Sequence, residues 1–151
     1  MPSDDAFPDM PDPGPQGRPQ DGGVVDLAAF KARAHPNWCL AAPADALPGL
    51  TPHILTAMLP MSPDRLCGLM ARMLRGRPRT RIIAADPNAF RIDAIQRSRI
   101  FRFTDDVALW AMPVGDGAAP VILSRSRIGR HDLGANRRRV ENWLGALTSG
   151  R

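Results

Sequence analysis

The chain has 151 residues, which is enough for one domain with a hydrophobic core and too few for two ordinary domains. Its 16 Pro and 13 Gly exclude an uninterrupted helical bundle, and its two Cys cannot form a disulfide scaffold. No stretch reaches the roughly 18 apolar residues that a membrane span needs, and the acidic start lacks the features of a secretory signal. The sequence therefore predicts a cytoplasmic protein with reduced cysteines and no membrane span.

The formal charge of +5 is unevenly distributed. Residues 1–26 contain six Asp and one Arg, a balance of −5, so the rest of the chain carries +10. Residues 1–24 are rich in Pro, Asp and Gly and predict a disordered acidic tail. The basic remainder attracts anions, and Arg, its dominant cation, grips carboxylate and phosphate bidentately. We also hypothesise that the tail partly neutralises this field, so that deleting residues 1–24 would strengthen anion binding.

The next segment, residues 25–50, is predicted to be an irregular lead that contains a short helix. Leu27, Phe30 and Ala34 share one side of that helix. The prolines between residues 35 and 50 favour extended, turn-rich structure, because proline lacks an amide donor and disfavours helix before it. A single domain is then expected over residues 51–151.

That domain begins with a short extended piece at 53–58 and a helix. Ser62 is a suitable N-cap, Pro63 suits the first helical position, and Gly76 suits the end. A second helix is expected from Asp132, as its N-cap, to about Leu147. Between the helices the pattern changes to alternation and turns, which predicts strands at 80–85, 90–103, 107–112 and 120–128 with turns at 86–88 and 115–117.

This order of elements predicts an α+β fold. Tight turns between the strands favour an antiparallel sheet of four to five strands, and two amphipathic helices can cover one of its faces. The other face is then expected to be polar or to bind a ligand.

The tetrapeptide RSRI occurs twice, at 97–100 and 125–128. Because strand side chains alternate, Arg97 and Arg99 share a face, as do Arg125 and Arg127. If the two strands are neighbours, up to four guanidinium groups meet on one surface, where they need interleaved carboxylates or a polyvalent anion. Two interpretations stay open: a structural charged face whose partners are Asp93, Asp105 and Asp106, or an anion site.

Other chemistry has weaker support. No CxxC or HxxxH pair is present, so we expect neither a metal site nor a cofactor. Cys39 and Cys67 are expected in the core. A triad of Ser126, His131 and Asp132 lacks a supporting motif such as GxSxG. The basic charge permits nucleic-acid binding, but no binding motif is present, and Phe101 and Phe103 are expected in the core although they could stack on bases.

Three segments resemble a bacterial family catalogued as domain of unknown function 1499. They are PNWCLAAPAD at 36–45, QRSRIFRFTDD at 96–106 and SRSRIGRHDLGANRRRVENWL at 124–144, and the resemblance covers about residues 36–147. It implies no reaction. It implies recurring positions at Asn37, Cys39, Arg97, Ser98, Ser124, Arg125, Ser126, Arg127, Gly129, Asp132, Gly134, Asn136 and Arg139.

Asp132, Asn136 and Arg139 are spaced to share one side of the last helix, where they can staple it to the sheet or form the wall of a polar pocket. We predict a non-catalytic module that binds a small or polymeric anion. The alternatives are an enzyme of unknown reaction with a polar site near the start of the last helix, and a nucleic-acid-binding protein. The predicted ligand-binding residues are Arg97, Arg99, Ser124, Arg125, Ser126, Arg127, Asp132, Asn136 and Arg139, while catalytic residues stay undetermined.

Overall fold

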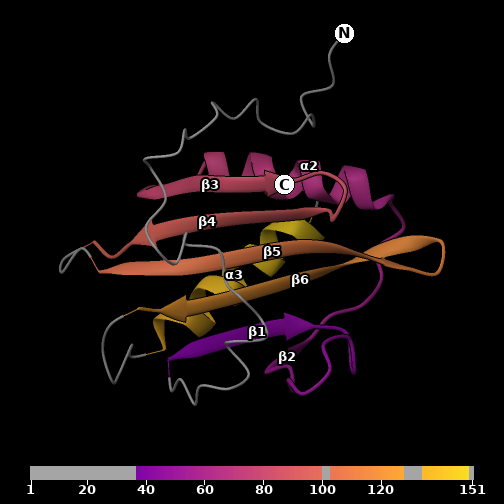
Figure 1. Ribbon diagram of the computed structural model, residues 1–151, viewed down its shortest axis with the longest axis horizontal. Coiled ribbons are helices and arrows are strands. Elements are labelled where there is room, and N and C mark those ends of the chain that lie inside the picture. The colour runs from indigo at the N-terminus through magenta and orange to yellow at the C-terminus, as the bar shows by residue number, and fades with distance from the viewer. Residues whose placement is uncertain (1–36, 100–102, 128–133, 150–151) are drawn as a thin grey trace, which may run out of the picture.

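A computed structural model describes residues 37–99, 103–127 and 134–149. Its strands form one six-stranded sheet in the order β2-β1-β6-β5-β4-β3, and both helices lie on one face of that sheet (Figure 1). The strands are β1 Trp38–Ala42, β2 Ile54–Leu55, β3 Thr80–Asp86, β4 Arg91–Arg97, β5 Thr104–Val114 and β6 Gly117–Ser126, and the helices are α2 Pro63–Arg75 and α3 Ala135–Thr148. Neither helix is long and apolar enough to cross a membrane.

The α+β prediction is confirmed, but the sheet is larger than expected and is mixed. β2 runs parallel to β1, whereas the other neighbouring strands are antiparallel. The additional strand is β1, in a segment that the prolines predict to be an irregular lead. This prediction is wrong because Pro36 and Pro43 flank the apolar run at 38–42 without interrupting it, and the run pairs with β6 inside the sheet. The short helix predicted in this lead, with Leu27, Phe30 and Ala34 on one side, lies outside the described residues.

The ends of β4 and α3 also differ from prediction. β4 stops at Arg97, short of the predicted residue 103, because the Ser98 amide donates to the Phe103 carbonyl (2.9 Å). α2 begins as predicted, with the Ser62 hydroxyl accepting the Arg65 amide (3.2 Å). In α3, however, Gly134 occupies the N-cap position with φ of 76°, so the prediction of Asp132 as N-cap is wrong. A left-handed residue at 134 prevents the helix from extending further toward the N-terminus.

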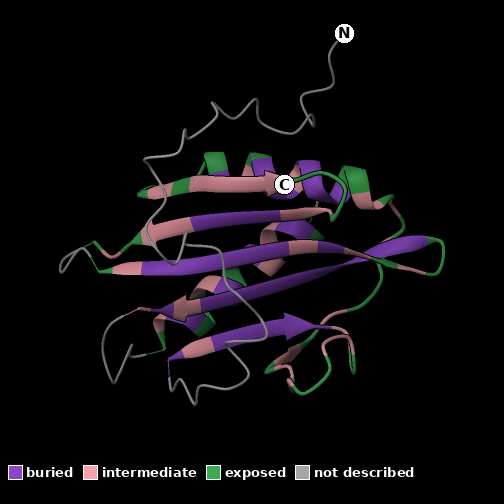
Figure 2. Ribbon diagram, viewed as in Figure 1, coloured by how far each residue is buried: buried purple, intermediate pink, exposed green. Residues whose placement is uncertain are grey.

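The main core lies between the sheet and the two helices. Alternate residues of the strands point toward the helices, and the purple strand segments in Figure 2 mark how fully the middle of the sheet is buried. The helices contribute apolar side chains at helical spacing, which is why both amphipathic stripes were visible in the sequence. The buried helix residues include Leu66, Met70 and Leu74 of α2 and Val140, Trp143 and Leu147 of α3.

The helix-free face of the sheet carries a second apolar cluster. Leu40, Ala108, Val121 and Leu123 are fully buried there. The expectation that this face is polar or binds a ligand is wrong for its central part, because the segment after β1 lies against it. The side chains that pack around the cluster are Trp38, Ala46, Leu47, Leu50, Trp110 and Met112.

His53 joins the segment before β2 to β1. Its Nδ1 accepts the Leu40 amide (3.0 Å), and its ring meets Trp38 edge-on with the centroids 4.5 Å apart. Partial burial, followed by the positive charge of Arg137, lowers the pKa of His53 below its usual 6.5. The hydrogen bond from the Leu40 amide agrees with this direction, because only an unprotonated Nδ1 can accept it.

This geometry predicts lower stability in mild acid. A lowered pKa means that the unfolded chain binds the proton first, so stability is complete above pH ~6.5 and falls as the pH drops. We expect the urea midpoint to decrease between pH 7 and the pH at which folded His53 titrates, and we expect His53→Gln, which keeps an acceptor, to remove that part of the decrease. An unchanged pH profile in this variant would contradict the prediction.

Candidate functional site

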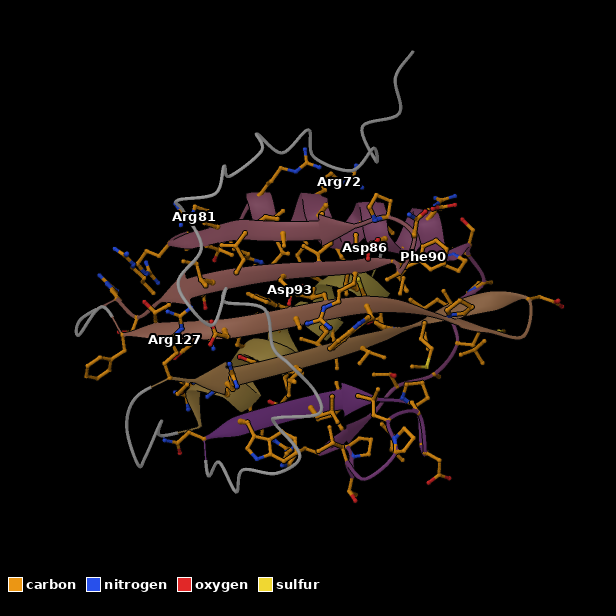
Figure 3. The ribbon with its side chains drawn as sticks, in the orientation of Figure 1. Arg72, Arg81, Asp86, Phe90, Asp93 and Arg127 are labelled. Atoms are coloured by element: carbon orange, nitrogen blue, oxygen red, sulfur yellow. The ribbon has the colours of Figure 1, made fainter. Side chains whose placement is uncertain are left out.

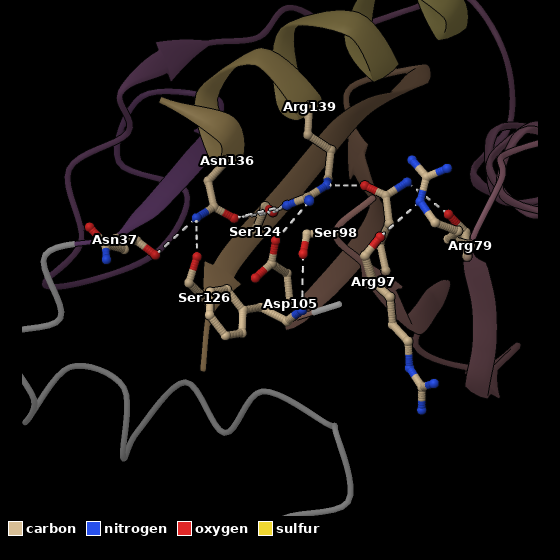
Figure 4. A network of polar contacts seen from close by, with 12 residues as sticks. Asn37, Arg79, Arg97, Ser98, Asp105, Ser124, Ser126, Asn136 and Arg139 are labelled. Carbon is tan, nitrogen blue, oxygen red and sulfur yellow. Dashed lines mark hydrogen bonds and ion pairs between the residues drawn. The ribbon is translucent and has the colours of Figure 1, made fainter. Parts of the chain in front are cut away.

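A buried polar network joins the start of α3 to the helix-facing side of the sheet (Figure 4). The Asn136 amide nitrogen donates to the Asn37 carbonyl (3.1 Å) and to the Ser126 hydroxyl (2.8 Å). The Ser124 hydroxyl donates to the Asn136 side-chain oxygen (2.7 Å). One buried asparagine therefore links α3 to β6 and to the residue before β1.

Arg139 extends this network across the sheet. Its Nη2 donates to Asp105 on β5 (2.8 Å), and its Nη1 donates to Ser124 (2.9 Å) and to Asn136 (3.0 Å). Its Nε donates to Gln96 on β4, whose amide in turn donates to the Thr80 hydroxyl on β3 (2.8 Å). The guanidinium group thereby connects one helix with three strands.

The network indicates that Asn136 and Arg139 attach α3 to the sheet and favours this interpretation over a polar pocket. The side chains of Arg139 and Asp105 are only 9% and 8% exposed, and Asn136 and Ser124 are buried. Buried polar groups in protein interiors are stable when they are paired in this way. Asp132 and His131, which the enzyme hypothesis needs, lie outside the described residues, and the Ser126 hydroxyl is buried as an acceptor for Asn136.

A second charged group lies on the helix-free face. Arg127 binds the Asp106 carboxylate through Nε (3.0 Å) and Nη2 (2.8 Å), and Arg125 approaches the same carboxylate at 3.4 Å. Asp106 is fully buried. On β4, Arg91 binds Asp93 bidentately and lies over the Trp110 ring at 4.4 Å. For Arg125 and Arg127 these contacts match the structural charged face, with Asp106 as the shared partner. The other two predicted partners hold different arginines: Asp93 binds Arg91, and Asp105 binds Arg139 in the buried network.

The two RSRI segments are not neighbours, because β5 lies between β4 and β6. Instead, the end of β4 lies beside the start of β3. The Arg97 amide donates to the Arg79 carbonyl (3.0 Å), the Arg79 Nε donates to the Arg97 carbonyl (3.1 Å), and Arg81 pairs in register with Ile95. Arg81 and Arg127 project at the same end of the sheet in Figure 3.

We call the exposed residues Arg79, Arg81, Arg97 and Arg99 the arginine corner. None of the four forms an ion pair within the described part of the chain. Arg97 points away from the buried network, as Figure 4 shows. The predicted site residues that the structure describes therefore fall into three groups: the buried network, the arginine corner, and the Asp106 group, which consists of Asp106, Arg125 and Arg127.

Sequence reasoning missed Arg79, Arg81 and Gln96. The two arginines alternate in RGRPRTR, which leads into a predicted strand at 80–85, and this was the available signal for a second basic strand end. Gln96 carried no signal, since its role depends on α3 crossing above β4. Asn37 entered only through the family resemblance.

The described residues hold no group of three or more His, Cys, Asp or Glu side chains arranged to bind a metal ion. Both cysteines are buried, and burial, with a smaller effect of Asp64, raises the pKa of the Cys67 thiol to about 12. A thiol with so high a pKa is a poor nucleophile at neutral pH. A shallow groove of about 210 Å³ lies between the last turns of α2 and α3, and no predicted site residue lines it.

Comparison with known proteins identifies the family. The family model described as "Protein of unknown function (DUF1499)" matches residues 31–147. The chain belongs to the DUF1499 family. No curated protein and no solved structure matches it.

In this DUF1499 protein, the positions that the resemblance singles out are divided between both faces of the sheet. Asn37, Ser124, Ser126, Asn136 and Arg139 all meet in the buried network. Arg97 lies in the arginine corner, and Arg125 and Arg127 lie in the Asp106 group. Five of the positions that the resemblance singles out thus attach the last helix to the sheet, and the exposed arginines are a separate feature.

Proposed function

We propose that this DUF1499 protein is a non-catalytic module that binds a small or polymeric anion at the arginine corner. The observation that carries the proposal is that exposed arginines without a carboxylate partner in the described parts of the chain gather where β3 meets β4. They are Arg79, Arg81, Arg97 and Arg99, and hydrogen bonds join Arg79 to Arg97. The arginines that do have a carboxylate partner are Arg91, Arg125, Arg127, Arg137 and Arg139.

Electrostatics supports a polyvalent ligand at this place. Hydrogen bonds between Arg79 and Arg97 hold the ends of two strands together, which keeps two exposed cationic side chains at neighbouring backbone positions. A phosphate or carboxylate group that bridges such cations relieves the repulsion and accepts charge-assisted hydrogen bonds. The charge of +10 outside residues 1–26 attracts such ligands from solution.

The test is loss of anion binding in a fold that stays intact. We expect Arg97→Ala with Arg99→Ala to weaken binding of inorganic tripolyphosphate at least tenfold in calorimetry at low salt, because two charge-assisted hydrogen bonds are worth about 1.5–3 kcal/mol each. The matched control is Arg65→Ala with Arg72→Ala, which removes two exposed arginines from α2. If both double variants weaken tripolyphosphate binding equally, the site is not localised at the corner, and binding depends only on the overall positive charge of the protein.

A second candidate, nucleic-acid binding, is favoured by Phe103. The expectation that Phe103 enters the core is wrong: the residue is 45% exposed, and its amide donates to the Ser98 hydroxyl (2.9 Å) beside the corner. Exposed aromatic rings next to arginines are typical of surfaces on which single-stranded bases stack.

Phe103→Leu separates the two candidates. We expect it to weaken oligothymidylate binding about fivefold or more if bases stack on the ring, since stacking is worth about 1–3 kcal/mol per base. Tripolyphosphate binding should not change. Oligothymidylate binding that is unaffected by high salt would exclude this candidate, because counterion release makes such binding salt-dependent.

A further inference from the structure

The arginine corner has a strong internal candidate for a partner in the same chain. Residues 1–26 carry six Asp and one Arg and no Lys or Glu. Aspartate carboxylates are the side-chain groups that guanidinium binds most readily. Prolines are spread among these aspartates.

The position at which the described chain begins makes contact feasible. The Asn37 carbonyl accepts the Ser126 amide (3.0 Å), Ser126 pairs in register with Asp105, and the neighbouring Thr104 pairs with Arg97. Asn37 is therefore at the same end of the sheet as the corner. Neighbouring strands are about 4.8 Å apart, so three steps from β1 to β4 span roughly 14 Å.

The connecting segment is long enough for this distance. Ten residues, 27–36, separate the acidic segment from Asn37. Fully extended, they span up to about 33 Å, about twice the distance across the strands. A tethered ligand within reach has an effective concentration in the millimolar range, so a weak carboxylate interaction is sufficient.

We propose that residues 1–26 bind the arginine corner of their own chain and compete with external anions for it. This inference rests on the proposed function and adds its regulation: the bound anion must displace the acidic segment. The corner thereby becomes a surface with two alternative acidic ligands, one tethered and one free. Loss or neutralisation of the acidic segment would expose the corner.

The experiment compares two full-length variants with the same change of charge. The first replaces Asp12, Asp21 and Asp26 by Asn, and the second replaces the exposed residues Asp45, Asp64 and Asp116 by Asn. Tripolyphosphate affinity is measured by calorimetry at low salt. We expect about threefold to tenfold tighter binding in the first variant and less than a twofold change in the second. In the Arg97→Ala, Arg99→Ala background the gain of the first variant should disappear.

Each outcome decides a separate question. Equal affinities of the wild type and both variants would overturn the competition and leave the proposed function intact. Equal gains in tripolyphosphate affinity in both variants would show that any loss of negative charge strengthens binding, and this result would also overturn the competition. If no form binds tripolyphosphate, the proposed function fails first. A wild-type dimer that disappears in the first variant would show that the segment binds a second copy and would overturn the intramolecular contact.

Discussion

Replacing Arg139 by alanine is expected to lower the free energy of unfolding by about 3–5 kcal/mol, because removing one partner of a buried pair leaves the other charge uncompensated. Asp105 would keep its carboxylate with a side chain only 8% exposed, and the side-chain oxygens of Gln96 and Asn136 would lose a donor. Urea unfolding followed by circular dichroism measures the change.

Two further variants show whether the geometry of the Arg139 guanidinium group matters or only its positive charge. Arg139→Lys keeps the cation but not the five fixed donors, so we expect an intermediate loss of about 1–2 kcal/mol. Arg137→Ala removes an exposed arginine whose i,i+4 pair with Glu141 is worth about 0.5 kcal/mol or less. If Arg139→Ala lowers the free energy of unfolding no more than Arg137→Ala does, the prediction that Arg139 attaches α3 to the sheet is contradicted.

Replacing Asp106 by asparagine is expected to destabilise the fold and to strengthen anion binding. Breaking a buried ion pair costs about 3–5 kcal/mol, but Arg125 and Arg127 are 17% and 29% exposed and can turn toward water, so we expect about 2–3 kcal/mol. The released guanidinium groups lie at the same end of the sheet as Arg97. Calorimetry should show tripolyphosphate binding at least threefold tighter.

Asp116→Asn is the matched control for this prediction. It removes the same charge from the exposed turn between β5 and β6, at the opposite end of β5. Surface substitutions of this kind usually change stability by less than about 0.5 kcal/mol. If Asp106→Asn destabilises the fold without a gain in anion binding over Asp116→Asn, Arg125 and Arg127 act in the structure alone.

Local signals in the sequence were sufficient for most of the elements. Ser62, Pro63 and Gly76 mark the ends of α2, because capping depends only on residues within one turn. Asp86 accepts the amides of Asn88 and Ala89, as the turn prediction implied. The same local reasoning failed at β1, whose five residues become a strand only because β6 and β2 lie beside them.

The candidate site was less accessible to such reasoning. Alternation correctly placed Arg125 of β6 and Arg127, the residue after this strand, on one face of the sheet, and their common partner is Asp106. The pairing of strands decided the rest: β5 separates the two RSRI segments, and β3 brings Arg79 to Arg97. Contacts between residues distant in sequence are set by strand order, which the alternation of side chains does not encode.

The sequence by itself determined the α+β class, the two amphipathic helices and the excess of positive charge after residue 26. These properties follow from composition and short-range periodicity, which tertiary contacts do not alter. Only the tertiary structure decided which arginines are neutralised, because an ion pair requires that two distant strands or a helix and a strand bring opposite charges within about 4 Å. Whether an arginine lies in the buried network, like Arg139, or in the exposed arginine corner, like Arg97, is therefore decided only when the sheet is assembled.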